Sequence, residues 1–229
     1  MPGAIASVWS NSENMKNTTV IQQAQSDSIA VCAHHLRSGD VIAFATDTVY
    51  GVGCVVQDAE AIRRIYAIKE RDMLKAIPVL IGNTDQLPLI AREIAPLAQQ
   101  LANQFWPGAL TIILKKVLGL PDVLTIYDSV GVRMPDHAWL RNLLASCGPL
   151  AVTSANISGE PSLSTASEVL ASLNGRIDLL VDGGPCSGGI PSTIVDCTEE
   201  TPRILRDGAI AEQVLQSITL KQQGIDRRD

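Results

Sequence analysis

The sequence predicts an α/β fold, a single domain in which a twisted mixed sheet is flanked by helices. Short apolar runs, too short for helices, alternate along the chain with stretches whose apolar residues recur every three or four positions. The 229 residues suit one large domain, and apolar residues make up 46% of them, which is enough for a core. Because aromatic residues are only 3%, that core must be built from Val, Ile, Leu and Ala.

The first predicted elements follow a polar beginning. Residues 1–27 are rich in Asn, Ser, Gln and Thr, and we expect a loosely ordered extension there. Ser28 is a suitable cap for an amphipathic helix that Gly39 ends. The apolar run 41–45 predicts a buried strand, and Asp58 is a suitable cap for a second helix.

The same alternation continues to the end of the chain. Glu93 is expected to open a helix with Pro96 in its first turn. Three further helices are expected near residues 137–146, 166–174 and 209–217. Apolar runs predict strands over residues 77–81, 110–114, 130–134, 150–153, 179–181, 193–195 and 204–205. Since no repeat or low-complexity linker follows residue 28, we expect one domain over residues 28–217 and a short tail over residues 218–229.

The charge balance disfavours one class of function. Lys and Arg number 18 against 24 Asp and Glu, a net charge of −6 at pH 7. Proteins that coat nucleic acid by bulk charge are normally basic, so we do not expect that role, although a small basic patch fits the composition. No apolar run approaches the ~20 residues of a membrane span, and the N-terminus lacks a signal-peptide pattern. We therefore expect no membrane association and a cytoplasmic location.

The five cysteines favour the same compartment. They form no C-x-x-C pair and no metal-binding spacing, so we expect no metal site made by the protein. Their odd number and apolar neighbours favour reduced, buried thiols in a cytosolic protein over disulfides or zinc ligands. They are Cys32, Cys54, Cys147, Cys186 and Cys197.

Polar residues follow several predicted strands, and open α/β sheets bind ligands at such strand ends. Two hydroxyls, a carboxylate and a phenol come directly after the strand at 41–45: Thr46, Asp47, Thr48 and Tyr50. They predict either a ligand site or a polar turn that the carboxylate caps. Ser154 and Asn156 follow the strand at 150–153 and leave the same two interpretations open.

Cations lie at three further places. Lys69 and Arg71 end the second helix, where they either complement the helix dipole or receive a polyphosphate or carboxylate. Arg133 lies in an otherwise apolar strand, where it either points outward or presents its planar fork to a carboxylate. Arg206 follows another strand, after a glycine-rich loop over residues 183–191 that matches no common phosphate-binding motif.

Taken in this order, the polar stretches resemble the motifs of the YrdC/Sua5 family, the L-threonylcarbamoyladenylate synthases. The resemblance runs from about residue 28 to Ile210. The matching stretches are Thr46-Asp47-Thr48-x-Tyr50-Gly51, Lys69-x-Arg71, Gly131-x-Arg133, Ser154-x-Asn156, Gly189-x-x-Ser192-Thr193-Ile194-x-Asp196 and Arg206-Asp207-Gly208. Each stretch is weak evidence alone, whereas the ordered set is specific.

The resemblance implies a concave α/β domain with a basic cavity, and an enzyme that transfers a nucleotidyl group. L-threonine, bicarbonate and ATP would give threonylcarbamoyl-AMP and pyrophosphate. A tRNA threonylcarbamoyl transferase complex would then use the product to modify adenosine 37 of tRNA. Mg²⁺ would be bound mainly through the ATP phosphates and would need no protein cage.

The resemblance also implies roles for individual residues. The catalytic residues would be Lys69, Arg71, Ser154 and Asn156. ATP would contact Lys69, Arg71, Ser129, Ser154, Asn156, Ser164 and Arg206. L-threonine would contact Thr46, Arg133, Thr153 and Ser192.

Two departures from the family motifs leave other interpretations open. Asp72 follows Arg71 where the family usually has Pro, and Ala45 precedes Thr46 where many members have Pro. A carboxylate at 72 could draw Arg71 away from phosphate. This motivates the alternative of a catalytically weak relative that binds double-stranded RNA or tRNA. A carbamoyl-phosphate-using module is a third alternative. We expect the short family form, without a further C-terminal domain.

Overall fold

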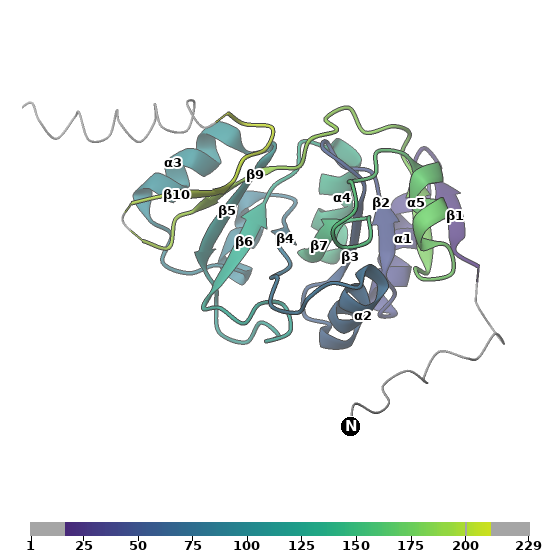
Figure 1. Cartoon of the computed structure of the whole chain (residues 1–229), viewed down its shortest axis with the longest axis horizontal. Coiled ribbons are helices and arrows are strands. Elements are labelled where there is room, and N and C mark those ends of the chain that lie inside the picture. Colours follow the sequence, from purple (N-terminus) through teal and green to yellow (C-terminus); the bar gives the residue numbers. More distant parts are fainter. Residues whose placement is uncertain (1–16, 200, 212–229) are drawn as a thin grey trace, which may run out of the picture.

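A computed structural model describes residues 17–199 and 201–211. Within them, ten strands form one sheet in the order β1-β8-β2-β3-β7-β4-β6-β5-β9-β10 (Figure 1). The strands are Thr19–Gln22 (β1), Ile42–Phe44 (β2), Gly51–Val55 (β3), Val79–Leu80 (β4), Leu110–Lys115 (β5), Ser129–Arg133 (β6), Leu150–Ser154 (β7), Leu179–Asp182 (β8), Thr193–Asp196 (β9) and Arg203–Arg206 (β10). The helices are Ser28–Arg37 (α1), Ala59–Lys69 (α2), Pro96–Phe105 (α3), Ala138–Cys147 (α4) and Ala166–Leu173 (α5), with a 3₁₀ helix over Thr84–Leu89.

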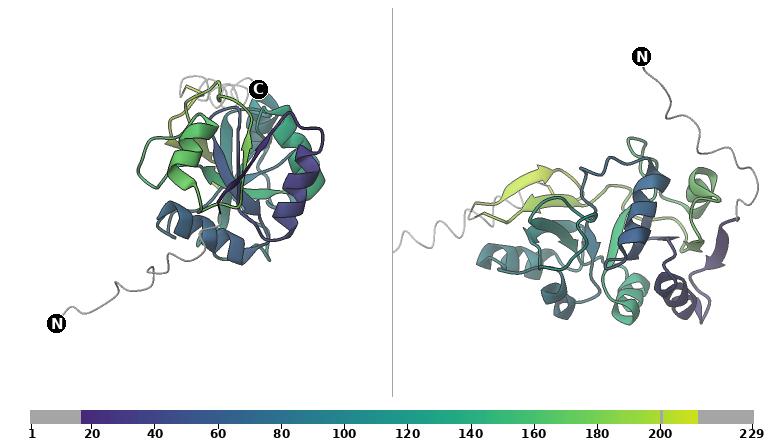
Figure 2. Two further views of the ribbon diagram at one scale, coloured as in Figure 1. Left: turned by 90° about the vertical axis from the view of Figure 1, so that its right-hand side faces the viewer. Right: turned by 90° about the horizontal axis from the view of Figure 1, so that it is seen from below.

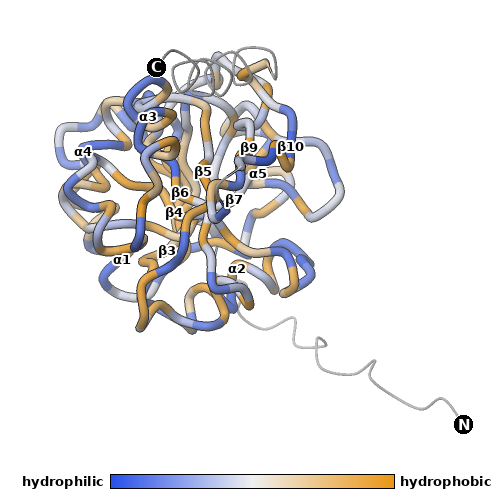
Figure 3. The backbone as a smooth tube through the Cα atoms, turned by 90° about the vertical axis from the view of Figure 1, so that its left-hand side faces the viewer, coloured by the Kyte–Doolittle hydropathy of each residue, from blue (hydrophilic) through white to orange (hydrophobic). Residues whose placement is uncertain are grey.

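The predicted α/β class and mixed sheet are confirmed. The pairs β1–β8, β2–β8, β4–β6 and β5–β9 are parallel, and the other described pairs are antiparallel. Helices α1 and α4 pack with the sheet in one apolar cluster, and α2 and α5 belong to a second cluster on the other face (Figure 2). Val, Ile, Leu and Ala dominate the buried residues, and Figure 3 shows hydrophobic segments gathered in the central strands.

The predicted cap of α2 is present, whereas that of α1 lies one residue earlier. The Asp58 carboxylate accepts hydrogen bonds from the backbone N–H groups of Glu60 and Ala61 at 3.0 and 2.9 Å. Ser28 is the first residue of α1 rather than its cap. Its hydroxyl donates to the Gln23 carbonyl at 2.8 Å, so it fixes the chain that enters the helix.

The predicted polar extension is wrong for its last residues, because the sheet begins at β1. This strand pairs in parallel with β8. The buried hydroxyl of Thr18 donates to the Ile177 carbonyl at 2.9 Å and anchors its beginning. A four-residue strand with three exposed residues at the edge of a sheet carries little apolar signal, so composition alone assigned it to the extension.

Two further elements differ from the prediction. The sequence predicts only a turn after β2. In the structure this turn leads into the strand β3, whose glycines lie against Val152 of β7. A Cβ at Gly51 or Gly53 would lie 2.9 or 2.8 Å from that side chain, so the close strand approach requires glycine. Helix α3 begins at Pro96 rather than Glu93, because the residue before a proline is held extended.

The end of the predicted domain lies partly outside the described residues. Residues 209–211 are not helical, and the rest of the helix expected over 209–217 falls beyond the described part of the chain. The expected tail over residues 218–229 and residues 1–16 also lie outside it. No described helix combines the length and the apolar character that crossing a membrane requires.

All five cysteines are free in the structure, and the predicted burial is right for three of them and wrong for two. Cys32, Cys54 and Cys197 are buried, and Cys147 and Cys186 are half-buried. Burial raises the thiol pKa of each of the three buried cysteines from 9.0 to about 12. The thiolate is the reactive form, so these three thiols should be inert in the folded protein.

This inertness is open to direct test by alkylation with iodoacetamide at pH 8. A pKa raised from 9.0 to about 12 lowers the thiolate fraction about a thousandfold, so Cys54 should be modified only after unfolding. Mass spectrometry of peptides from native and urea-treated protein measures the modification. Labelling of Cys54 in the native protein at the rate of an unfolded thiol would contradict the buried placement.

Candidate active site

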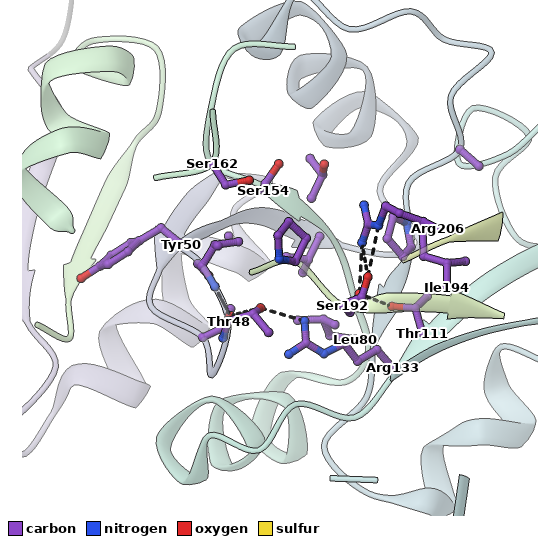
Figure 4. Close-up of a pocket in the computed structure, with 18 of the residues that line it drawn as sticks. Thr48, Tyr50, Leu80, Thr111, Arg133, Ser154, Ser162, Ser192, Ile194 and Arg206 are labelled. Carbon is purple, nitrogen blue, oxygen red and sulfur yellow. Dashed lines mark hydrogen bonds between the residues drawn. The ribbon is translucent and has the colours of Figure 1, made fainter. Parts of the chain in front are cut away.

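A cavity of about 200 Å³ lies where β5, β6 and β7 meet the turn between β2 and β3. The loop after α2 and the segments around β9 and β10 complete its wall (Figure 4). The polar side chains that line it are Thr46, Thr48, Tyr50, Arg71, Thr111, Arg133, Thr153, Ser154, Ser162, Ser192 and Arg206. Seven of them belong to the residues predicted from the sequence: Thr46, Arg71, Arg133, Thr153, Ser154, Ser192 and Arg206. Strand ends that lie up to 160 residues apart in sequence, 46 to 206, therefore meet in one cavity.

Arg133 faces this cavity rather than the solvent. Its Nη2 donates to Asp47 Oδ1 at 2.5 Å, and its Nη1 donates to Thr48 Oγ1 at 3.0 Å. Its Nε donates to the Gly108 carbonyl at 3.0 Å. A guanidinium has five N–H donors, so two remain, one on each Nη. The contacts fix the plane of the fork and leave donors for a carboxylate.

The Thr46 hydroxyl is used inside its own turn. It donates to the Val49 carbonyl at 2.7 Å and accepts the backbone N–H groups of Thr48 and Val49 at 3.0 and 3.2 Å. The hydroxyl of Thr48 lies 3.0 Å away. Thr46 therefore shapes the turn that presents Thr48 and Asp47 to Arg133, and its predicted contact with a ligand stays a prediction.

Arg71 and Arg206 bring positive charge that no carboxylate of the described residues pairs with. Arg71 donates to the carbonyls of Lys75 and Ala76 at 3.0 and 2.9 Å, and Arg206 donates to the Ser192 carbonyl at 3.1 and 2.8 Å. Neither arginine pairs with a carboxylate in residues 17–199 and 201–211. Burial and then the charges of Arg133 and Arg71 lower the pKa of Arg206. Arg206 is thus close enough to Arg133 and Arg71 to be repelled by them, and an anion in the cavity would relieve that repulsion.

The carboxylate of Asp72 does not capture Arg71. The side-chain Oδ1 of Asp72 accepts the backbone N–H of Leu74 at 2.9 Å, and the backbone carbonyl of Asp72 accepts the N–H of Lys75 at 3.0 Å. Asp72 therefore closes the turn that places the Lys75 carbonyl against Arg71. The departure from the family motif leaves the guanidinium in the cavity.

Lys69 does not line the cavity, contrary to its predicted grouping with Arg71. The side chain is 1% exposed, and its Nζ donates to the carbonyls of Ser154 and Asn156. Its own carbonyl accepts the N–H of Ser158 at 2.8 Å. The reason is local, since the left-handed backbone of Glu70 (φ 52°) turns the chain between the two cations. Lys69 ties the end of α2 to the segment 154–158.

Three other predicted residues also lie outside the cavity lining. The Asn156 amide donates to the carbonyls of Ile157 and Glu160 at 2.8 and 2.7 Å, and its buried Oδ1 has no hydrogen-bond partner among the described residues. The Ser164 hydroxyl donates to Glu168 at 3.3 Å, at the capping box of α5. Ser129 opens β6, opposite Lys115. The structure places these residues near the site or at element ends, not on its inner wall.

Several lining residues were absent from the predicted set of ligands. Thr48 and Tyr50 belong to the turn identified from the sequence, so the same motif could have indicated them as lining residues. Thr111 lies in an apolar strand and Ser162 in a polar loop, so neither carries a signal in the sequence alone. Only the pairing of β5 with β9, in which Thr111 lies opposite Ile194, brings the Thr111 hydroxyl to that of Ser192 in the cavity wall.

The comparison with family models decides the relationship. The model of the Sua5/YciO/YrdC family, described as telomere recombination, matches residues 34–208. The chain belongs to this family. Threonylcarbamoyl-AMP synthases of Pyrococcus abyssi and Bacillus subtilis are each 38% identical over 192 and 193 residues, 83% of this chain. These alignments span only 56% of the length of either relative, so the chain matches about half of each.

Solved structures support the same family fold. The crystal structure of Pyrococcus abyssi Sua5 complexed with L-threonine is 36% identical, with a TM-score of 0.82 over 88% of this chain and 59% of that one. The crystal structure of Escherichia coli YciO is 27% identical, with a TM-score of 0.75 over 83% of this chain and 94% of that one. This chain therefore shares the mixed α/β fold of these two structures.

The burial of Lys69 has a consequence for stability. Burial and, to a lesser extent, Arg71 lower the Lys69 pKa from 10.5 to about 8. Between these two pH values the unfolded chain binds more protons than the folded one, so stability rises with pH in this window. Urea unfolding from pH 7 to 9.5 should show the wild type gaining free energy of unfolding relative to Lys69→Met as the pH passes 8. Comparison with the variant cancels the titration of cysteines and tyrosines. A difference that is constant with pH would contradict a buried ammonium.

Proposed function

We propose that the protein is an L-threonylcarbamoyladenylate synthase, which converts L-threonine, bicarbonate and ATP into threonylcarbamoyl-AMP and pyrophosphate. The observation that carries the proposal is the convergence of Arg71, Arg133 and Arg206 on one cavity in a chain of net charge −6. Two of these cations have no carboxylate partner in the described residues, so the cavity suits anionic substrates. Relatives of the same family carry this activity in their names, and the Pyrococcus abyssi structure contains L-threonine.

The proposed reaction needs positioning and charge rather than a protein nucleophile. The threonine amine adds to bicarbonate, water leaves, and the resulting N-carboxylate attacks the α-phosphorus of ATP. The bond to the β-phosphate breaks, and pyrophosphate leaves. Each of the three substrates carries at least one negatively charged group, so fixed cations that hold them together lower the barrier.

Arg133 is suited to the threonine carboxylate in this scheme. Its fork is held by Asp47, Thr48 and the Gly108 carbonyl, and its two remaining N–H donors can bind two carboxylate oxygens. Thr153 and Ser192, which also line the cavity, would contact the rest of the amino acid.

Arg71 and Arg206 are suited to the phosphates, with the Ser154 hydroxyl beside them. A cavity of about 200 Å³ is smaller than the ~300–1,000 Å³ of pockets that enclose whole ligands. We therefore place the reacting groups inside the cavity and the adenosine toward its rim. Lys69 and Asn156 would act indirectly, because they hold the segment 154–158, which carries Ser154.

The residues around the cavity fit Mg²⁺ only as a companion of ATP. The described residues contain no group of three or more His, Cys, Asp or Glu side chains that could hold a metal ion, and Asp47 is paired with Arg133. Mg²⁺ commonly binds through substrate phosphates. When bound there, it would neutralise phosphate charge alongside Arg71 and Arg206.

The wider role follows from the product. Threonylcarbamoyl-AMP is a reactive mixed anhydride, and we propose that a tRNA threonylcarbamoyl transferase complex uses it to modify adenosine 37 of tRNA in the cytoplasm. Direct contact with tRNA or double-stranded RNA is not needed for the synthase step.

Pyrophosphate release tests the proposed reaction. Purified protein with Mg²⁺, ATP, bicarbonate and L-threonine should release pyrophosphate, and omission of L-threonine should abolish the release because no carbamate can then form. A coupled pyrophosphatase assay measures it, and mass spectrometry identifies the adenylate. Absence of release under every combination, together with steeply salt-dependent binding of double-stranded RNA, would favour the RNA-binding alternative.

Removal of one cavity cation tests the proposed phosphate site. Arg71→Ala should lower kcat/KM for ATP by about 10- to 150-fold, because a hydrogen bond to a charged group contributes about 1.5–3 kcal/mol. Arg63→Ala is the matched control, since Arg63 lies on α2 with an exposed ion pair to Glu60 and does not line the cavity. Steady-state kinetics of both variants against the wild type give the comparison. Equal rates for Arg71→Ala and Arg63→Ala would exclude Arg71 from the site.

A further inference from the structure

A pair of buried hydroxyls connects two strands at the wall of the cavity. Thr111 on β5 and Ser192, directly before β9, are 3% and 5% exposed. Their Oγ atoms lie 2.7 Å apart (Figure 4). Both residues line the cavity, and Thr111 makes no other side-chain hydrogen bond with the described residues. The hydroxyl of Thr111 is therefore dedicated to Ser192.

Ser192 in turn is the partner of Arg206. The guanidinium donates to the Ser192 carbonyl from Nε and Nη2, at 3.1 and 2.8 Å, and from Nη2 to the Ser192 Oγ at 3.2 Å. These three contacts are all the hydrogen bonds that the Arg206 side chain makes with the described residues. The position of this cation thus depends on one serine.

Electrostatic repulsion acts on the guanidinium that Ser192 holds. Arg206 feels the charges of Arg133 and Arg71, which act with burial to lower its pKa. Repulsion of this kind favours conformations in which the guanidinium leaves the cavity for solvent. A serine hydroxyl that can rotate freely would hold the guanidinium less well than one fixed by a second hydrogen bond.

Proton counting shows what Thr111 adds. Arg206 occupies one lone pair of the Ser192 hydroxyl, and one of the two hydroxyl protons of the pair lies between the two Oγ atoms. The other hydroxyl proton stays free to donate to an acceptor in the cavity. Thr111 therefore both fixes Ser192 and lets the pair present one donor beside Arg206.

We propose that Thr111 is a positioning residue of the polyphosphate site, which acts through Ser192 to hold Arg206 toward the bound anion. The inference rests on the proposed function, because ATP and pyrophosphate are the polyanions concerned. It adds a residue from an apolar strand to a site otherwise built from strand ends and loops.

The test compares binding of ATP and of inorganic pyrophosphate by calorimetry, without L-threonine. Thr111→Val keeps the shape and removes the hydroxyl, and should weaken both ligands about 3- to 10-fold, the range for one hydrogen bond. Thr111→Ser keeps the hydroxyl and should bind within twofold of the wild type. Thr125→Val, which removes a buried hydroxyl outside the cavity, is the matched control and should bind as the wild type does.

A double-mutant cycle shows whether Thr111 acts through Ser192. Thr111→Val should weaken binding no further in a Ser192→Ala background, because the link is already broken. Additive losses would overturn the inference, as would wild-type affinity in Thr111→Val or equal losses in Thr111→Ser. If Thr111→Val is too unstable to assay, Ser192→Ala alone must lose affinity, and retention of affinity there would also overturn the inference.

The same measurements separate this inference from the proposed function. Wild-type protein that neither binds ATP nor releases pyrophosphate would show that the proposed function is wrong. Wild-type protein that does both, beside an unaffected Thr111→Val, would show that only the role of Thr111 is wrong.

Discussion

Three arginines share one cavity, where Arg206 is repelled by the other two, and the fold holds each of them with backbone carbonyls. Arg71 rests on the carbonyls of Lys75 and Ala76, Arg133 on that of Gly108, and Arg206 on that of Ser192. A carbonyl orients a guanidinium without neutralising it, whereas a carboxylate would cancel its charge. The cavity therefore keeps positive charge for a ligand although the whole chain is acidic. Asp47 is the exception, and its pairing with Arg133 fixes the one fork that we assign to a carboxylate.

Lys69 and Arg71 belong to one short motif but have different roles. Helix α2 ends at Lys69, and the left-handed backbone of Glu70 that follows directs Lys69 into the interior and Arg71 to the cavity. The Lys69 ammonium donates to two carbonyls of the segment 154–158 and fixes that segment. Arg176 pairs with Glu70 on the outer side of the same turn. A buried ammonium that bonds only to carbonyls costs stability through desolvation. In this position Lys69 fixes the segment 154–158 beside the site.

Much of the fold could be predicted from the sequence, because the signals are local. The capping of α2 by Asp58 and the buried strand 42–44 follow from residues close in the chain. Strand β1 and strand β3 could not be predicted with the same reasoning. The first has three exposed residues at a sheet edge, and the second owes its glycines to the approach of Val152 from β7. The same difference separates the site residues, since Arg133 and Ser192 lie in motifs whereas Thr111 is one threonine in an apolar strand.

The sequence by itself determined the α/β class, the family and the residue types of an anion site, since these reside in periodicity and in short ordered motifs. Only the tertiary structure decided which motif residues share a wall. In the structure the Lys69 side chain points away from the cavity that Arg71 lines, and the Thr46 hydroxyl bonds within its own turn. The pairing of two strands places Thr111 beside Ser192. The physical reason is that hydrogen-bond partners and burial depend on strand pairing between distant segments, which no local pattern in the chain encodes.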